Sequence, residues 1–521
     1  MARRSTKHNY FDFLEVERLY NKRLKAEDDA RARRDAMLAA AALVYRPVNN
    51  LPYELLTEIF TLAVTNQFAD ELCLGRVCPS SIIPMAGSIS QVCQRWRALM
   101  LGTWMRHLWS YVFVPSPTTV KEARFFLPQV SLCLERSGDT PLRIIIHIDP
   151  RLSFGTAQRR LYTNYCNRLL ARSTSWSKAS IVCSGSFSEF SAYLHDCQLP
   201  MLTHLRLAFA IDNPHGRSHV LDRLAPHLQC VEMIQTFHTT IFSPGWSRVT
   251  RVRIGDQSTH LFFCLLILLE CPRIEDYQFA YCAEHTDDLN LRVLRQCPRV
   301  KYLRIIAYGD HLEHRSSLAH AFAYLQMPML ESLQIDSAST TWHSDSFLSF
   351  LSSSPLETLE LKCNGLTEWQ LIRILERVPW LLHLKVYETV DVCDFFKHEH
   401  LTALTDELIL RLTVDRKEFN TKRCLVPLLQ TIDLQGSQFL SAYFVDMIRS
   451  RWFGLQREDG YNKRLLTAGA GLSTVAQLES VKLHLLPMKS HYAIQPTSHP
   501  EVLNSLGELE AEGLTVEITV Y

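Results

Sequence analysis

A short motif recurs between residues 199 and 434 of this 521-residue chain. Each copy has a proline, an apolar residue soon after it, and then two apolar residues separated by one other residue. Clear copies begin at Leu199, Cys271, Cys297, Met327, Ser354, Val378 and Val426, and weaker copies lie at 246–254 and 478–485. Where copies are consecutive they lie roughly 20–29 residues apart, a period that predicts stacked structural repeats.

Each repeat predicts one short strand with a helix before it. Alternate side chains of a strand point to opposite faces, so the two apolar residues of a triplet point inward and the middle one outward. Apolar runs such as 347–351 and 371–375 predict the helices, and the proline marks the turn from helix to strand. One unit cannot bury both its faces, so we predict an α/β solenoid with a concave parallel sheet and helices on the convex side. The last strand is expected at 514–520, after a helix at 500–511.

The middle residues of the triplets are expected to form a row on the concave face of the sheet. These candidate substrate-binding residues are Arg206, Gln278, Arg304, Gln334, Glu360, Lys385 and Asp433. At any single position an ordinary solvated side chain is the simpler interpretation, but the group would form a broad polar surface. Its mixed charges favour a protein partner over nucleic acid, which would call for a mainly basic surface.

The segment from Leu51 to Trp109 has the pattern of short, apolar helices. Pro52 suits the first turn of a helix, and Glu54 in that turn complements the helix dipole. Apolar residues then recur at helical spacing as far as Ala63, and again between residues 89 and 100. Helices this short and this apolar cannot bury their surface alone, so they require each other and a further partner.

This segment resembles the F-box, the helical module that docks onto the Skp-family adaptor of SCF-type (cullin–RING) ubiquitin ligases. The resemblance rests on Leu-Pro-x-Glu-Leu-Leu-x-x-Ile-Phe at 51–60 and Val-Cys-x-x-Trp-Arg at 92–97. The resemblance is strongest to the F-box-like proteins abundant in mushroom-forming fungi. In those proteins a longer insert, here 65–88, separates the two halves of the motif. It implies that the adaptor-binding residues are Leu51, Pro52, Leu55, Ile59, Phe60, Val92, Cys93 and Trp96.

The repeats in turn resemble irregular leucine-rich repeats. Together the resemblances imply a substrate-recognition subunit, whose F-box binds the adaptor and, through it, a cullin, and whose repeats bind a protein substrate. Such a subunit has no catalytic residues and raises the effective concentration of substrate near a ubiquitin-loaded enzyme. A second interpretation remains open, a non-catalytic scaffold whose F-box-like helices only cap the apolar end of the solenoid.

Three parts are expected along the chain: an N-terminal helical arm at 1–46, the F-box-like module at 47–115 and the repeat domain at 120–521. The arm has a helical pattern at 10–44 whose apolar stripe fades after Leu24, so a surface helix is favoured over a coiled coil. A helix at 125–135 and a buried strand at 142–148 are expected to open the repeat domain.

Composition favours an intracellular protein, cytoplasmic or nuclear. The sequence begins without the apolar run of a signal peptide, and its 15 cysteines lack paired spacing, so we expect reduced thiols. The most apolar run, 261–269, is shorter than the ~20 residues that span a bilayer and predicts a core helix. The net charge of +1 gives no field that would attract nucleic acid or an anionic membrane.

The sequence contains none of the common catalytic motifs. It has no glycine-rich phosphate loop, no Gly-x-Ser-x-Gly turn and no His-Glu-x-x-His helix. The Lys-His-Glu-His run at 397–400 has no second cluster at ligand spacing, and Cys73 and Cys78 have no further ligands nearby, so a zinc site is not expected. We therefore predict no enzyme activity, no cofactor and no metal.

Overall fold

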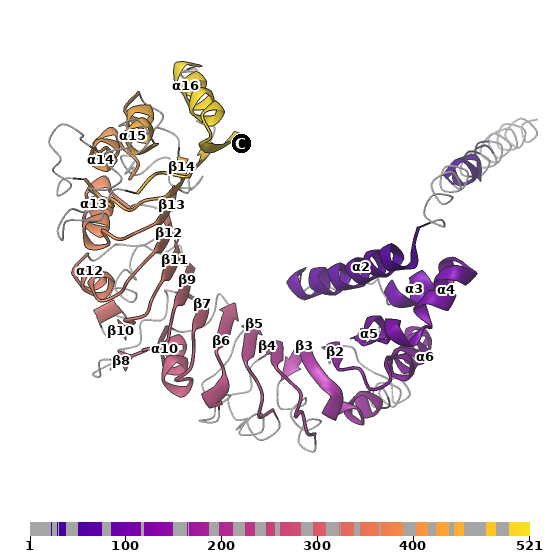
Figure 1. Ribbon diagram of the computed structural model, residues 1–521. Coiled ribbons are helices and arrows are strands. Elements are labelled where there is room, and N and C mark those ends of the chain that lie inside the picture. Colours follow the sequence, from indigo (N-terminus) through magenta and orange to yellow (C-terminus); the bar gives the residue numbers. More distant parts are fainter. Residues whose placement is uncertain are drawn as a thin grey trace, which may run out of the picture. The chain divides into compact units, whose positions relative to one another are not determined.

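The chain divides into two units by its internal contacts. The first comprises Met1–Leu74 and Ile83–Trp109, and the second Gly75–Ile82 and Ser110–Tyr521. Figure 1 shows their helices and strands. The computed structural model describes residues 22, 25, 29, 31–37, 51–74, 85–115, 119–148, 164, 166–186, 197–211, 225–234, 246–255, 261–282, 295–308, 322–323, 325–337, 344–363, 366–388, 403–414, 424–436, 442–452, 476–485 and 500–520.

The first unit is helical. Its elements are α2 (Tyr53–Leu74), α3 (Met85–Val92), α4 (Gln94–Met100), the 3-10 turn η2 (Thr103–Met105) and α5 (Arg106–Trp109). No glycine or proline interrupts α2, so it continues into the insert expected at 65–88, and α3 begins within that insert. The described residues of the N-terminal arm, between 22 and 37, are helical, and the rest of the arm lies outside the described residues.

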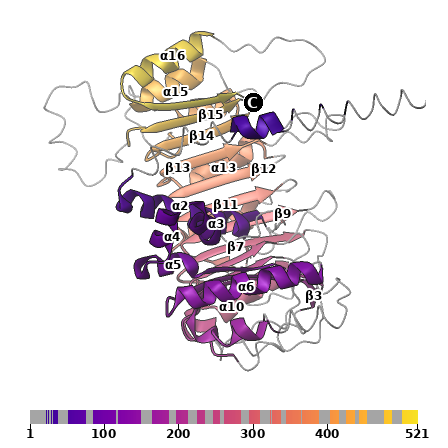
Figure 2. The same cartoon turned by 90° about the vertical axis from the view of Figure 1, so that its right-hand side faces the viewer.

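The second unit is built on a 14-stranded sheet whose spatial order follows the chain. Its strands are β1 (Tyr111–Val114), β2 (Leu142–Ile148), β3 (Trp176–Ser186), β4 (His204–Ile211), β5 (Cys230–Ile234), β6 (Arg251–Gly255), β7 (Asp276–Cys282), β9 (Tyr302–Tyr308), β11 (Ser332–Ser337), β12 (Thr358–Cys363), β13 (His383–Tyr387), β14 (Thr431–Gly436), β15 (Ser480–Leu485) and β16 (Thr515–Val520). All neighbours in this sheet pair in parallel, as predicted. Figure 2 shows β7 to β15 lying side by side. A separate parallel pair joins β8 (Arg295–Gln296) to β10 (Leu325–Gln326).

Because neighbouring strands are parallel, the chain must return after each strand to the end of the sheet at which the strands begin. The helices on these return segments are α6 (Val120–Ser137), α10 (Leu261–Glu270), α12 (Ser344–Ser352), α13 (Glu368–Arg377), α14 (Asp406–Leu412), α15 (Ala442–Trp452) and α16 (Pro500–Ala511). In Figure 1, α10 and α12 to α15 lie along one side of the strands. The predicted helices at 125–135, 261–269 and 500–511 correspond to α6, α10 and α16, and the strand predicted at 142–148 is β2. β1, which the sequence placed in the helical module, belongs to the sheet.

The paired apolar residues of the triplets form the core against the helices. Each of them is 3% exposed or less: Leu205, Leu207, Tyr277, Phe279, Leu303, Ile305, Leu333, Ile335, Leu359, Leu361, Leu384, Val386, Ile432 and Leu434. The strands that carry these residues belong to one sheet, as predicted, with β5 and β6 between the first and second of them.

In most repeats the proline occupies the same type of turn, but in the repeat that begins at Ser354 the Glu357 amide donates to the Glu331 carbonyl instead of closing a turn. In the repeat that begins at Cys271, the amide of Ile274 donates to the Cys271 carbonyl at 3.2 Å, with Pro272 exposed between two buried ends. Proline suits the second position of such a turn because its fixed φ matches it and its missing N–H is not needed there. The same bond closes the turns at Leu199–Leu202, Ala225–Leu228, Cys297–Val300, Met327–Leu330, Val378–Leu381 and Val426–Leu429.

Backbone hydrogen bonds join each repeat to the next just ahead of the strands. The Glu275 carbonyl accepts from the amides of Lys301 and Tyr302 at 2.8 and 3.0 Å. The Lys301 carbonyl in turn accepts from Glu331 and Ser332, both at 2.9 Å. Because these bonds involve only the backbone, stacking continues through repeats whose side chains depart from the motif.

Two candidate binding surfaces

Helix α2 carries two apolar stripes, and only one of them is buried. Leu56, Phe60 and Val64 are 0%, 1% and 4% exposed. The second stripe, which we call the docking stripe, consists of Leu55, Ile59 and Leu62, which are 47%, 45% and 54% exposed. The sequence pattern groups residues of both stripes together, whereas the structure separates a packing face from an open one.

Several of the expected adaptor-binding residues make contacts within the helical unit itself. The Phe60 ring packs edge-on against Trp96 with centroids 4.7 Å apart. The Sγ of Cys93 accepts from the Trp96 amide at 3.4 Å and so caps α4. The guanidinium of Arg95 donates to the Leu51 carbonyl at 2.6 Å. The Phe60–Trp96 contact and the Arg95 bond hold the two halves of the motif together.

The structure therefore divides the eight expected adaptor-binding residues. Pro52, Leu55, Ile59 and Val92 are exposed, and Leu51, Cys93 and Trp96 are half-buried. Phe60 presents no surface to a partner because its ring lies in the core, so we leave it out of the docking surface. Pro52 itself stands just before α2, and its carbonyl accepts the Leu56 amide at 3.1 Å.

Sequence reasoning missed several exposed apolar residues of this unit, among them Leu62, Leu101 and Trp104. Leu62 lies seven residues after Leu55, the helical spacing that would have identified it. Leu101 and Trp104 follow α4 and are 49% and 53% exposed. No periodic pattern marked these two, since they lie in the short segment around η2.

The second candidate surface is a row of side chains across the sheet, which we call the polar row. Strand register makes each member the neighbour of the next. In order the row is Arg206, Glu232, Arg253, Gln278, Arg304, Gln334, Glu360, Lys385, Asp433, Lys482 and Glu517. Arg206 and Asp433 are each 9% exposed, while the other predicted members are half-buried.

All seven predicted substrate-binding residues lie in this row, and sequence reasoning missed the other four. Glu232 follows an unnoticed copy of the motif, which starts at Ala225 and contains Pro226. Arg253 and Lys482 lie in the two weaker copies, and Glu517 lies in the final strand. The register shows that these weaker copies also form strands that pair with their neighbours in the sheet.

Charges in the C-terminal part of the polar row neutralise one another. Glu360 accepts a 2.7 Å hydrogen bond from Gln334 and lies 3.4 and 3.5 Å from the ammonium groups of Lys362 and Lys385. The Lys362 ammonium also lies over the Tyr387 ring, 5.1 Å from its centroid. Glu360 therefore has two positively charged neighbours that offset its charge.

The last strands of the sheet contain one polar cluster around Asp433 and one ion pair. Asp433 accepts from the Tyr387 hydroxyl at 2.8 Å and lies 3.3 Å from Nε2 of His484. Lys482 donates to Glu517 at 2.5 Å. That hydrogen bond and ion pair raise the pKa of Lys482 and lower the pKa of Glu517.

The first strands of the sheet carry more positive charge. Burial, and then the charges of Lys178, Arg251 and Arg143, lower the pKa of His204. Burial, and then the charge of Arg206, lower the pKa of His147 to about 4. The acids that offset this charge are Glu232, 3.8 Å from Arg206, and Asp276, 2.7 Å from Arg251. The row is thus electrostatically uneven from one end to the other.

The residues considered for a metal site are not brought together in the described part of the chain. The run at 397–400 and Cys78 lie outside the described residues, and for Cys73 only its place in α2 is described. Across the described ranges no three His, Cys, Asp or Glu side chains are grouped so as to hold a metal ion. No described helix combines the length and apolar character needed to cross a membrane.

No protein-family model matches the chain, and no curated protein is significantly similar to it. The F-box and leucine-rich-repeat resemblances therefore depend on the motifs quoted above and on the surfaces described here.

Proposed function

We propose that this chain is the substrate-recognition subunit of an SCF-type ubiquitin ligase. The helical unit would dock on a Skp-family adaptor, and through it on a cullin, while the sheet unit would bind a protein substrate along the polar row. The observation that supports this best is the exposed docking stripe of α2, which lies within the segment that has the F-box pattern.

The docking stripe is suited to protein association on physical grounds. Its three side chains are each about half exposed, so covering them would contribute about 1 kcal/mol each through the hydrophobic effect. The Phe60–Trp96 contact fixes α2 against α4, which lowers the entropy lost when a partner binds. Exposed Tyr53 and Val92, at 52% and 40%, offer further apolar area in the same unit.

The sheet unit supplies a surface of a different character. The polar row runs through eleven strands, from β4 to β16, with amide and charged side chains and no gap in register. A surface of this kind favours an extended protein segment, because successive strands offer repeated polar contacts. Recruitment requires no catalytic group on this chain, since holding two proteins together is enough to raise their effective concentration.

The test is co-purification with a fungal Skp-family adaptor. The full chain is expressed with the adaptor and compared with the double variant Leu55→Asp/Ile59→Asp, whose substituted side chains are exposed and so leave the core unchanged. The matched control is Leu410→Asp/Tyr443→Asp, which places the same two charges at residues 47% and 48% exposed on α14 and α15. Circular dichroism and thermal unfolding confirm that each variant is folded.

We expect wild type and control to retain the adaptor and the docking-stripe variant to lose it. A carboxylate buried without a partner costs more than the apolar contact it replaces, so the loss is expected to exceed about tenfold in affinity. Equal adaptor binding by the folded Leu55/Ile59 variant would refute the proposal. No adaptor binding by the wild-type chain would also refute it and would favour a non-catalytic scaffold.

A further inference from the structure

The polar row changes character between its two ends. From Arg206 to Gln334 it contains three arginines, one glutamate and two glutamines, a net charge of +2. From Glu360 to Glu517 it alternates strictly between acid and base, with a net charge of −1. In the C-terminal part both lysines are held in ion pairs and the net charge is negative, so the positive potential available to a partner lies in the central strands.

Arg253 and Arg304 are the source of that potential. Among the residues that the structure describes, neither forms an ion pair. Glu232 is the register neighbour of Arg253, but its carboxylate lies 3.8 Å from Nε of Arg206. The Nε of Arg304 is buried and has no hydrogen-bond partner in this part of the chain, and a buried donor of this kind is costly unless a ligand satisfies it.

The two arginines are separated by a defined distance. They lie on β6 and β9 with Gln278 of β7 between them, in direct register. Two strand spacings are about 9.5 Å. In a polyproline II segment, residues i and i+3 lie on the same side and about 9.3 Å apart. The spacing of the arginines therefore matches two side chains three residues apart in an extended peptide that runs across the strands.

We propose that Arg253 and Arg304 bind two carboxylates, three residues apart, in an extended acidic segment of a protein partner. Each guanidinium can hold a carboxylate through two parallel N–H donors, the geometry for which arginine is best suited. The amide of Gln278 lies between the two and can bond the peptide backbone of that segment. Tyr302, 50% exposed and two residues before Arg304 on β9, offers an apolar surface beside the same site.

This inference rests on the proposed function only in identifying the bound segment as part of a substrate. Peptide binding at the arginines requires no adaptor, and adaptor binding requires neither arginine. Co-purification with the adaptor and peptide binding can therefore fail independently.

The experiment measures binding of a fluorescein-labelled (Pro-Pro-Glu)4 peptide to the full chain by fluorescence anisotropy. Two comparison peptides are (Pro-Pro-Gln)4, which lacks charge, and a proline peptide with the same four glutamates placed consecutively. The variants Arg253→Gln and Arg304→Gln are compared with Lys385→Gln and Lys482→Gln, which remove the same charge from the ion-paired part of the row. Arg304→Lys keeps the charge but removes the two-donor geometry.

We expect each arginine-to-glutamine variant to weaken binding of the spaced peptide about tenfold, the worth of a charged hydrogen-bonded pair. The lysine variants are expected to bind within about twofold of wild type, and Arg304→Lys to lie between wild type and Arg304→Gln. The spaced peptide is expected to bind more tightly than either comparison peptide.

Three results would overturn the proposal. One is that the arginine and lysine variants weaken peptide binding equally, which would indicate non-specific electrostatic attraction. Another is tighter binding of a single-stranded oligonucleotide than of the spaced peptide, which would indicate nucleic acid. The third is absence of peptide binding at millimolar concentration by a folded chain.

Discussion

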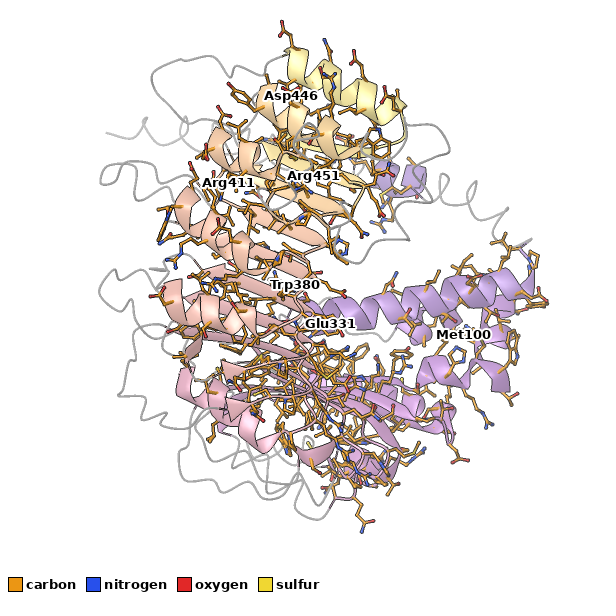
Figure 3. The ribbon with its side chains drawn as sticks, turned by 60° about the vertical axis from the view of Figure 1, so that its left-hand side comes forward. Met100, Glu331, Trp380, Arg411, Asp446 and Arg451 are labelled. Carbon is orange, nitrogen blue, oxygen red and sulfur yellow. The ribbon has the colours of Figure 1, made fainter. Side chains whose placement is uncertain are left out.

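The buried guanidinium of Arg451 provides the sharpest test of how the C-terminal repeats are held. Its side chain is 0% exposed and lies inside the unit, in contrast to the exposed Arg411 (Figure 3). It donates to the carbonyls of Leu412 at 2.8 Å, Leu425 at 2.8 Å and Val426 at 3.2 Å. Burial lowers the pKa of Arg451. These bonds tie α15 to the end of α14 and to the turn before β14.

Substitution of Arg451 by methionine keeps the apolar length and removes the donors. Each of the three carbonyls has a second donor besides Arg451. The Cys424 thiol lies near the carbonyls of Leu412 and Leu425, and the Leu429 amide donates to the Val426 carbonyl. The cost per carbonyl is therefore at the low end, about 1 kcal/mol, or about 3 kcal/mol in all. Stacked repeats open locally, so this loss acts on α14, α15 and β14 rather than on the whole chain.

Hydrogen–deuterium exchange of peptides from 403–452 measures that local opening. A loss of about 3 kcal/mol corresponds to roughly 100-fold faster exchange of the protected amides. The matched control is Arg449→Met, two residues earlier on α15, whose guanidinium makes an exposed ion pair with Glu508 at 3.3 Å. An exposed pair of this kind contributes less than about 1 kcal/mol. Exchange of Arg451→Met within threefold of the control would refute the assigned role.

Two further substitutions test individual groups of the sheet unit. Folding lowers the pKa of His147 from 6.5 to about 4. Between these two pH values the folded chain binds fewer protons than the unfolded chain, so the free energy of unfolding decreases as the pH falls from 6.5 to about 4. His147→Gln is expected to reduce the drop in melting temperature between pH 7 and pH 4.5, and an unchanged drop, matching that of the exposed control His227→Gln, would contradict this. The hydroxyl of Tyr277 donates to the Cys264 carbonyl of α10 at 2.5 Å, so Tyr277→Phe is expected to cost about 1 kcal/mol and speed exchange of 261–282 about fivefold. Tyr302→Phe, at a half-exposed ring, is expected to leave exchange unchanged, and equal rates for the two variants would argue against the bond.

The strands could be predicted because their signals are local. A turn that accepts proline and a triplet that alternates between the two faces lie within one short stretch, as in the repeat from Cys297 to Ile305. The prediction missed strands outside the motif, such as β3, and one copy of the motif, the repeat that begins at Ala225. The extension of α2 past Thr65 was likewise available, since no breaker residue occurs before Gly75.

The candidate surfaces could be predicted only in part, because their composition depends on distant elements. Ile59 and Phe60 are adjacent apolar residues that fit the helical periodicity equally well, so the sequence does not show which of them is buried. Packing against Trp96 of α4 buries Phe60 and leaves Ile59 exposed. Which face of a helix is covered is a property of the neighbouring element, not of the helix itself.

What the sequence determined was which residues form strands and which of their side chains face away from the core. What the tertiary structure decided was which of those side chains are neighbours. Register places Glu360 between Gln334 and Lys385, where its charge is neutralised, and places Arg304 between two glutamines, where its charge is not. A strand's own residues fix its alternation, but ion pairing depends on strands that are far apart in the chain and adjacent only in the folded sheet.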